Sequence, residues 1–590
     1  MSGSYWGVGD KVNINQTDIE IKAEGNDSFQ ENQVIGVFIP PSVKLFSGKD
    51  CTLNFDVKLN YDTSGAAKPT KFCLDGQTGA NCLFSKCVVY AGNRQTVIET
   101  LNEYNSWVSI KYSYDTNDAI KSRRALTEGC GEWTPSARGT LGSTKSMQNN
   151  HMFSQYNEQP NRNAAPNATI DAANSPVGIK ASVTLPIHMG CFQNSTKAFP
   201  CFATQGVFLE FTCAANSRVF RQMDSLTLNR KKCLNPIFHS RDGLGSQWTD
   251  VNNAQTTFYT YPFNNQFDTQ HSPFSVGEEV EFVDLDTGNT IGSAGGAGNI
   301  TITSIEAGTA AAPIRYNFAA TGVAATLAGD AQKFGVFSRA SQNAATKPDY
   351  TISNCRLSVR QLDVADYQAG MTQKMKNGGV IEFDIPSVAC ALQSSSAGDL
   401  QASIAVPCEH AKARSIVIMP TDSTAYSLVQ NIDSNATYRI DNLEPNPITT
   451  VATRARENFS DRSGISGIGD YLSHYSFNID GKIVPSRRID TNLTAGKDKG
   501  LNQGHLIELE KALEQSHGVP ARCFADFRNN FLIGRALTLD ANTVYDGRGK
   551  DIRLLTSYEG TAPDKPKLWK IFVSHIKTIS IKGDSVMVAN

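Results

Sequence analysis

The sequence lacks several features that would place it in common functional classes. No apolar run approaches the ~18–20 residues of a membrane-spanning helix, and no charged and then apolar leader opens the chain, so we expect neither a transmembrane nor a secreted protein. Ser2 stands where N-myristoylation requires glycine. An excess of charge is also missing, because 55 basic side chains face 57 acidic ones. This balance disfavours a main role in neutralising nucleic-acid phosphates.

Clustered metal-ligand motifs are missing as well. Cys73, Cys82 and Cys87 lie near one another, but no Cys-x-x-Cys pair or neighbouring histidine completes a zinc site. The nine histidines are scattered singly, and His188 falls within an apolar strand, where a core or interface role is predicted. Most of the 13 cysteines lie in apolar runs such as FTCAANS and SKCVVY, so we expect buried free thiols rather than a disulfide framework.

Four short motifs resemble catalytic or ion-binding elements but lack the partners that such sites need. The Asp-Thr-Gly at Asp286–Gly288 has no second copy to form an aspartic-protease dyad. Asp284 and Asp286 could open a calcium loop, but the remaining ligands do not follow. The runs GSAGGAGN and SGISGIGD lack the Lys-Ser/Thr of a phosphate-binding loop. We predict turns at these motifs, no catalytic residue, no metal or cofactor site, and no enzyme activity.

Basic residues gather only in short clusters, at Lys121–Arg124, Asn229–Lys232 and Pro485–Arg488. Clusters of this length are typical of solvated faces or of ion pairs with carboxylates. We therefore expect weak or non-specific contact with a genome at most.

What the sequence does contain is many short segments in which apolar and polar residues alternate with a period of two. Turn residues separate these segments. In CTLNFDVKLN the apolar side chains from Cys51 to Leu59 share one face, and Thr52, Asn54, Asp56 and Lys58 share the other. GVFLEFTC, TISNCRLSVRQL and VIEFDIP repeat the pattern. Strands with one dry and one wet face pack against a second sheet, so the pattern predicts antiparallel β-sandwiches.

The same order of parts occurs twice along the chain. In the first half, strands VIGVFIPP and CTLNFDVKL precede a hairpin at Gly92-Asn93, a helix with Leu101, Tyr104 and Val108 on one face, and further strands. In the second half, strands GGVIEFDIP, QASIAVP and RSIVIMP precede a hairpin at Asp480-Gly481, a strong type I′ turn signal. The helix GHLIELEKALEQSHG, with Leu506, Leu509 and Leu513 on one stripe, and closing strands follow.

This repeat predicts two domains, 1–365 and 366–590, with the boundary near Asp363–Gly379. Residues 274–337 contain short alternating strands around a Gly-rich turn and predict a small β-module inserted into a loop of the first domain. The stretch 136–176 is rich in Asn, Ser and Ala, and predicts an extended loop that orders against a neighbouring chain.

Three stretches resemble the major capsid proteins of the double jelly-roll lineage, particularly those of virophages and polinton-like viruses. They are VVYAGNRQTVIETLNEYN, TLPIHMGCFQNSTKAFPCFATQGVFLEF and YSFNIDGKIVPSRRIDTN. The lineage also includes adenoviruses and large DNA viruses. The resemblance implies an all-β fold of two tandem eight-stranded jelly-roll β-sandwiches, with short helices in loops and the small inserted β-module.

The resemblance also implies a function. The chain would be a major capsid protein, a structural subunit that homotrimerises into pseudo-hexagonal capsomers and tiles an icosahedral shell in the virion. Its partners would be itself, neighbouring trimers, and penton and minor or cement proteins. A lectin-like or adhesin β-sandwich that binds carbohydrate is the alternative, because lectins share the jelly roll. A jelly-roll glycosidase ranks last, since no acidic pair stands out and only five Trp are present.

Overall fold

The structure of the chain is a computed structural model. It describes residues 15–61, 72–74, 78–114, 124, 127–129, 179–193, 198–222, 237–239, 257–260, 279–284, 300–306, 314–318, 333–338, 348–423, 465, 467, 469, 472–491, 503–517, 531–538, 543–560, 562–563, 566–583 and 585–589. The predicted loop 136–176, the Asp286–Gly288 turn, the run GSAGGAGN and the Asn229–Lys232 cluster lie outside these residues.

The first half of the chain forms two antiparallel sheets. One sheet has the order β1 (Asn15–Lys22), β18 (Pro348–Asp363), β4 (Leu45–Tyr61) and β8 (Ile179–Pro186), and the short strands β2 (Ser28–Phe29) and β9 (Phe199–Pro200) add to it. The other has the order β3 (Val34–Ile39), β10 (Val207–Cys213), β6 (Phe84–Ala91) and β7 (Thr96–Asn102). We call these two sheets the first barrel.

The second half repeats this arrangement. One sheet has the order β19 (Ile381–Ser395), β26 (Lys567–Lys582), β21 (Ala413–Asp422) and β24 (Ile533–Ala536), and β27 (Ser585–Ala589) pairs with β26. The other has the order β20 (Gln401–Ala405), β25 (Ile552–Tyr558), β22 (Leu472–Ile479) and β23 (Lys482–Asp490). We call these two sheets the second barrel.

Both barrels follow the jelly-roll strand order. When the strands on the sheet paths are numbered along the chain within each half, both halves give sheets of order 1-8-3-6 and 2-7-4-5. Two copies of one strand order in tandem confirm the predicted double jelly roll. The short strands β2, β9 and β27 extend the sheets beyond the shared pattern.

Local sequence signals explain these elements. Along β4 the apolar side chains of Cys51, Leu53, Phe55 and Val57 are buried, whereas those of Thr52, Asn54 and Asp56 between them are only partly buried. Asp480 and Gly481 join β22 to β23 with positive φ angles of 53° and 81°, as a type I′ turn requires. In helix α8 (Gln503–His517) the predicted stripe holds, because Leu509 and Leu513 are buried and Leu506 packs against the core of the second barrel.

The other helices are α1 (Tyr104–Tyr114), α4 (Gly190–Gln193), α5 (Asn216–Val219) and α6 (Ala365–Lys376), with 3-10 turns η1 (Pro41–Val43) and η2 (Gly79–Leu83). Helix α6 connects β18 to β19 and thus lies between the two barrels in the chain. Within the described ranges, no helix has the length and hydropathy needed to cross a bilayer.

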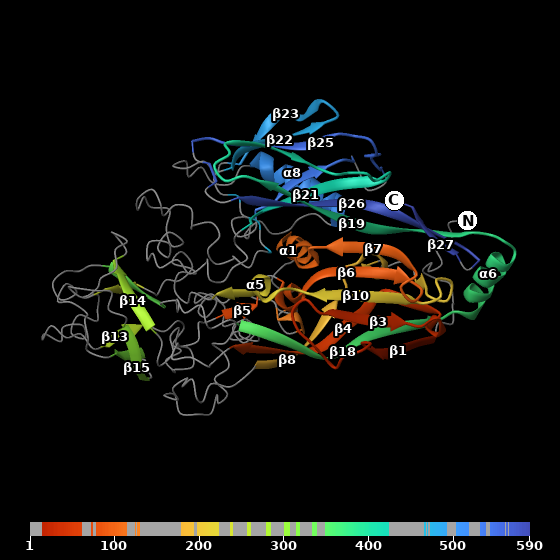
Figure 1. Ribbon diagram of the computed structural model, residues 1–590, viewed down its shortest axis with the longest axis horizontal. Coiled ribbons are helices and arrows are strands. Elements are labelled where there is room, and N and C mark those ends of the chain that lie inside the picture. The colour runs from red at the N-terminus through yellow and green to blue at the C-terminus, as the bar shows by residue number, and fades with distance from the viewer. Residues whose placement is uncertain are drawn as a thin grey trace, which may run out of the picture.

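A separate sheet is formed by residues that lie, in the sequence, between β10 and β18 of the first barrel. Its order is β12 (Ile237–His239), β17 (Lys333–Ser338), β14 (Glu279–Asp284), β15 (Ile300–Glu306), β16 (Ile314–Phe318) and β13 (Thr257–Thr260). Strands β12 and β13 precede the predicted 274–337 module, so this sheet includes residues that lie before the predicted start of the module. A small pair, β5 (Phe72–Leu74) and β11 (Phe220–Gln222), completes the described strands. In Figure 1 the separate sheet lies at the end of the molecule far from α6.

Candidate functional site

The two barrels pack side by side through a buried contact that we call the seam (Figure 1). Strands β19 and β26 of the second barrel face β7, α1 and α4 of the first. The rings of Trp107 and Phe572 lie 5.5 Å apart across it, and those of Phe199 and Phe383 lie 5.6 Å apart. One continuous apolar cluster therefore includes the interior of the first barrel and the seam.

At the seam, the sheet of the second barrel that contains β21 and β26 is buried on both faces. In β21, Ile416 and Ile418 pack into the second barrel, whereas Val417 and Met419 belong to the cluster that includes the seam. Strand β26 likewise buries both Phe572 and Val573. The sequence carries this signal, since RSIVIMP and KIFV are nearly continuous apolar runs rather than alternating ones.

The matching sheet of the first barrel has a different outer face. Its cross-strand neighbours are ion pairs and polar contacts: Arg356 lies 3.0 Å from Glu20, Arg360 lies 3.0 Å from Asp18, and Asn54 donates to Ser358. These side chains are exposed or partly buried. The two copies of one fold thus differ on this face. Among the described residues it is apolar and buried in the second barrel, and polar and partly exposed in the first.

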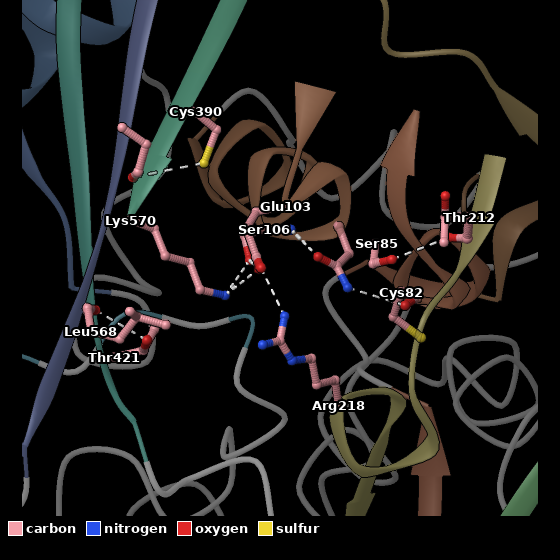
Figure 2. A network of polar contacts seen from close by, with 12 residues as sticks. Cys82, Ser85, Glu103, Ser106, Thr212, Arg218, Cys390, Thr421, Leu568 and Lys570 are labelled. Atoms are coloured by element: carbon pink, nitrogen blue, oxygen red, sulfur yellow. Dashed lines mark hydrogen bonds and ion pairs between the residues drawn. The ribbon is translucent and has the colours of Figure 1, made fainter. Parts of the chain in front are cut away.

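A buried ion pair crosses the seam at Lys570 (Figure 2). The ammonium of Lys570, on β26, is fully buried and lies 2.8 Å from the carboxylate of Glu103. It also donates a 2.7 Å hydrogen bond to the hydroxyl of Ser106, on α1. Arg218, on α5, lies 2.7 Å from the other carboxylate oxygen of Glu103. Glu103 therefore joins the second barrel to the segment that leads toward the separate sheet.

The electrostatics of Glu103 follow from these partners. Burial acts to raise the pKa of its carboxyl, but the positive charges of Lys570 and Arg218 outweigh burial and lower the pKa to about 2. The residue also has a positive φ of 54°, which is rare for a residue with a side chain. It directly precedes α1, and its carbonyl accepts the hydrogen bond from Trp107 N–H.

A second buried polar cluster surrounds His188, two residues after the end of β8. The hydroxyl of Tyr112 lies 2.8 Å from Nε2 of His188 and donates a 2.6 Å hydrogen bond to Glu128. The backbone N–H of His188 donates to the hydroxyl of Tyr104. Arg124, of the predicted basic cluster, stacks over the ring of Tyr112 at 3.6 Å and lies 3.9 Å from Glu128. His188 is thus a core residue with polar partners, as the sequence predicts.

The remaining candidates from the sequence do not come together. Cys82 and Cys87 are buried in the first barrel, and no group of three His, Cys, Asp or Glu in the described part of the chain is arranged to hold a metal ion. The Pro485–Arg488 cluster lies on the exposed strand β23, where Arg488 faces His474 and Glu559.

Sequence reasoning missed the charged groups of the seam and one histidine pair. His410 and His575 stack with their ring centroids 3.7 Å apart and an interplanar angle of 12°. They lie far apart in the sequence, and neither has another histidine close to it along the chain. No local sequence motif therefore predicts the pair.

Comparison with known proteins gives likenesses of structure only. No protein-family profile matches the sequence, and no curated protein matches it significantly. Similar solved structures include PBCV-1 VP54 fitted into a reconstruction of the virophage Sputnik (12% identity, 98% of each chain covered, TM-score 0.46). The Faustovirus major capsid protein has 8% identity, covers 97% of this chain and 91% of its own, and has a TM-score of 0.46. The mavirus major capsid protein has 9% identity, covers 100% and 93%, and has a TM-score of 0.38.

The second and third of these solved structures are major capsid proteins, of Faustovirus and of mavirus. At such identities and TM-scores they add no argument of their own. The strand order in the two barrels is sufficient evidence for the fold: this chain is a double jelly-roll protein.

Proposed function

We propose that this chain is a major capsid protein, a structural subunit that forms homotrimers and tiles an icosahedral viral shell. The observation that carries the proposal is the pair of jelly rolls fixed side by side by the buried seam. Three such pairs around a threefold axis present six similar barrels with a pseudo-hexagonal outline, and a hexagonal unit fills a surface without gaps. Heterologous contacts that close on themselves form such rings.

In this proposal the domains are residues 1–365 and 366–590, and the boundary between them falls at the start of α6. The separate sheet at one end of the molecule would decorate the outer surface of the shell. The role is structural without catalysis, and the location is the virion. The partners are other copies of the chain, penton proteins and minor or cement proteins, and contact with the genome is weak and non-specific.

The oligomeric state tests the proposal most directly. Three chains of 64.0 kDa give a trimer of 192 kDa, which light scattering on a sizing column distinguishes from a monomer. Negative-stain images of the same fraction should show hexagonal particles. A stable monomer that binds a glycan column would contradict the proposal and favour the lectin-like alternative.

A matched pair of variants tests whether the fixed pairing of barrels matters for assembly. A Cβ on Gly190 would overlap the backbone carbonyl of Pro386 across the seam, whereas a Cβ on Gly370, in α6, meets nothing within 4 Å. We expect Gly190→Ala to lower the trimer fraction and Gly370→Ala to leave it unchanged. Equal trimer fractions in both variants would show that assembly does not depend on the seam.

A further inference from the structure

The seam joins an edge strand of each barrel. Strand β7, the fifth strand of the first barrel, lies against β19, the first strand of the second barrel. Helix α4 packs on β19 as well, and the ring of Phe199 lies 5.6 Å from that of Phe383 on this strand. Only Val97 and Asn102 of β7 are exposed, because the second barrel covers most of the strand.

The doubled fold gives each of these two strands a counterpart that the chain leaves uncovered. The fifth strand of the second barrel is β23, the first strand of the first barrel is β1, and each is the last strand at one edge of its sheet. Six of the nine residues of β23 are exposed, and so are six of the eight residues of β1. In Figure 1, β23 and β1 lie on opposite sides of the molecule, with the seam between them.

Strand β23 combines an exposed apolar side chain with positive charge. Ile483 is 55% exposed, although isoleucine is among the residue types most often buried. The strand also exposes three basic residues, Lys482, Arg487 and Arg488, against one acidic residue, Asp490. An apolar side chain among like charges is typical of a surface that another molecule covers.

A loop beside β23 supplies a second exposed apolar side chain. Val544, in the loop between β24 and β25, is 47% exposed. Lys550 of the same loop lies 2.7 Å from Asp480, in the turn that leads into β23. Tyr545 pairs with Ala413 at the start of β21, just as β9 pairs with the start of β4 in the first barrel. The loop is therefore the counterpart of the segment that reaches β19 across the seam.

Strand β1 carries charge of the opposite sign. It has two acidic residues, Asp18 and Glu20, against one basic residue, Lys22. The side chains of Asp18 and Glu20 are 68% and 60% exposed, and their partners Arg360 and Arg356 on β18 are exposed too. Exposed ion pairs contribute little to stability, so these carboxylates can accept a further cation at small cost.

We propose that β23 of one chain docks against β1 of a second copy, so that the contact between chains repeats the contact of β7 with β19 within the chain. The loop that holds Val544 takes part as its counterpart does in the seam. The inference rests on the proposed capsid subunit and adds which surfaces of the two copies meet.

This contact joins two different surfaces, and such heterologous contacts form a closed ring when the rotation between copies closes. Charge favours the unlike pairing. Two β23 strands would bring basic side chains together, and two β1 strands would bring carboxylates together, whereas β23 on β1 brings opposite charges together.

The test measures the trimer fraction of the full chain over a range of protein concentrations, by light scattering on a sizing column. Ile483→Glu places a carboxylate in the docked surface and should raise the concentration at which half of the trimers dissociate by about tenfold or more. Leu400→Glu is the matched control. Leu400 is 50% exposed and directly precedes β20, at the opposite edge of the same sheet, so this variant should dissociate like the unsubstituted protein.

Charge reversal tests whether β1 is the partner strand. The double variant Arg487→Glu/Arg488→Glu makes β23 acidic, and Asp18→Lys/Glu20→Lys makes β1 basic. Each double variant should weaken the trimer by about tenfold, because like charges then face each other. All four substitutions in one chain should strengthen the trimer again, since the two strands regain opposite charges.

Three results would count against the inference. A trimer that neither Ile483→Glu nor the charge reversals weaken would overturn the docking and leave the proposed function standing. Weakening by both double variants without recovery in the combined variant would show that β23 and β1 meet other surfaces, and would overturn it as well. A monomeric unsubstituted protein would contradict the proposed function and this docking together.

Discussion

Glu103 combines a left-handed backbone with a buried carboxylate. A side-chain-bearing residue in this conformation is strained by about 1–3 kcal/mol, and such residues persist where the surroundings hold them. Here Lys570 and Arg218 hold the carboxylate from two directions, at 2.8 Å and 2.7 Å. The left-handed backbone at Glu103 therefore accompanies a side chain whose carboxylate lies in the seam, between Lys570 and Arg218.

Loss of this carboxylate should be costly. Glu103→Gln leaves the buried Lys570 without its counter-charge, so we expect a loss of about 3–5 kcal/mol in the free energy of unfolding, measured with denaturant. The double variant with Lys570→Met should lose less than the sum of the two single variants, because no buried charge is then stranded. Lys511→Met, which removes an exposed ion pair with Glu508, serves as control and should change stability by less than about 0.5 kcal/mol. Additive losses would show that the two residues are not coupled.

The cysteines should be unreactive in the folded protein. Nine are described as free thiols, eight of them buried, and burial raises the pKa of Cys51 and Cys390 to about 12 and that of Cys408 to about 11. Because the thiolate is the reactive form, brief alkylation at neutral pH should leave these nine unmodified in peptide mass spectra, with full labelling in denaturant. Rapid native labelling of any of the nine would contradict the packing of its strand.

At the scale of elements, α4 and β19 approach too closely for any side chain at Gly190. Gly190→Ala should reduce the free energy of unfolding by about 1–3 kcal/mol, because the new methyl group must displace the Pro386 backbone. Gly370→Ala, in the exposed helix α6, should leave stability unchanged or raise it by up to ~1 kcal/mol, since alanine favours a helix. If both variants unfold alike, the two elements do not pack as described.

Elements with strong local signals were predictable. Helix α8 agrees with its leucine stripe, and the hairpin at Asp480-Gly481 agrees with its turn residues, because both depend on neighbours within a few positions. The separate sheet was predicted less fully. Strands β12 and β13 are only 3 and 4 residues long and pair with strands far along the chain, so no local pattern assigns them to that sheet.

At the scale of the whole molecule, the shared apolar cluster makes the two barrels one cooperative unit. We expect a single calorimetric transition for the unsubstituted protein. Phe572→Ala removes the ring that packs on Trp107 in the seam, and should separate the transition into two. Val573→Ala, on the other face of β26, should lower the midpoint without separating it. Two separated transitions in the unsubstituted protein would contradict one cooperative unit.

The sequence by itself determined strands, turns and a repeated order of parts, because period-two burial and turn chemistry are local properties of the chain. The jelly-roll strand order joins strands far apart in the sequence, such as β1 with β18 and β19 with β26, so the sequence indicated it only through the family resemblance. Only the tertiary structure decided which faces of the two barrels meet and which charges meet there. Ser106 and Lys570 are 464 positions apart, and their contact depends on how two finished sheets dock. The continuous apolar runs of β21 and β26 show that a second covered face exists, but not what covers it.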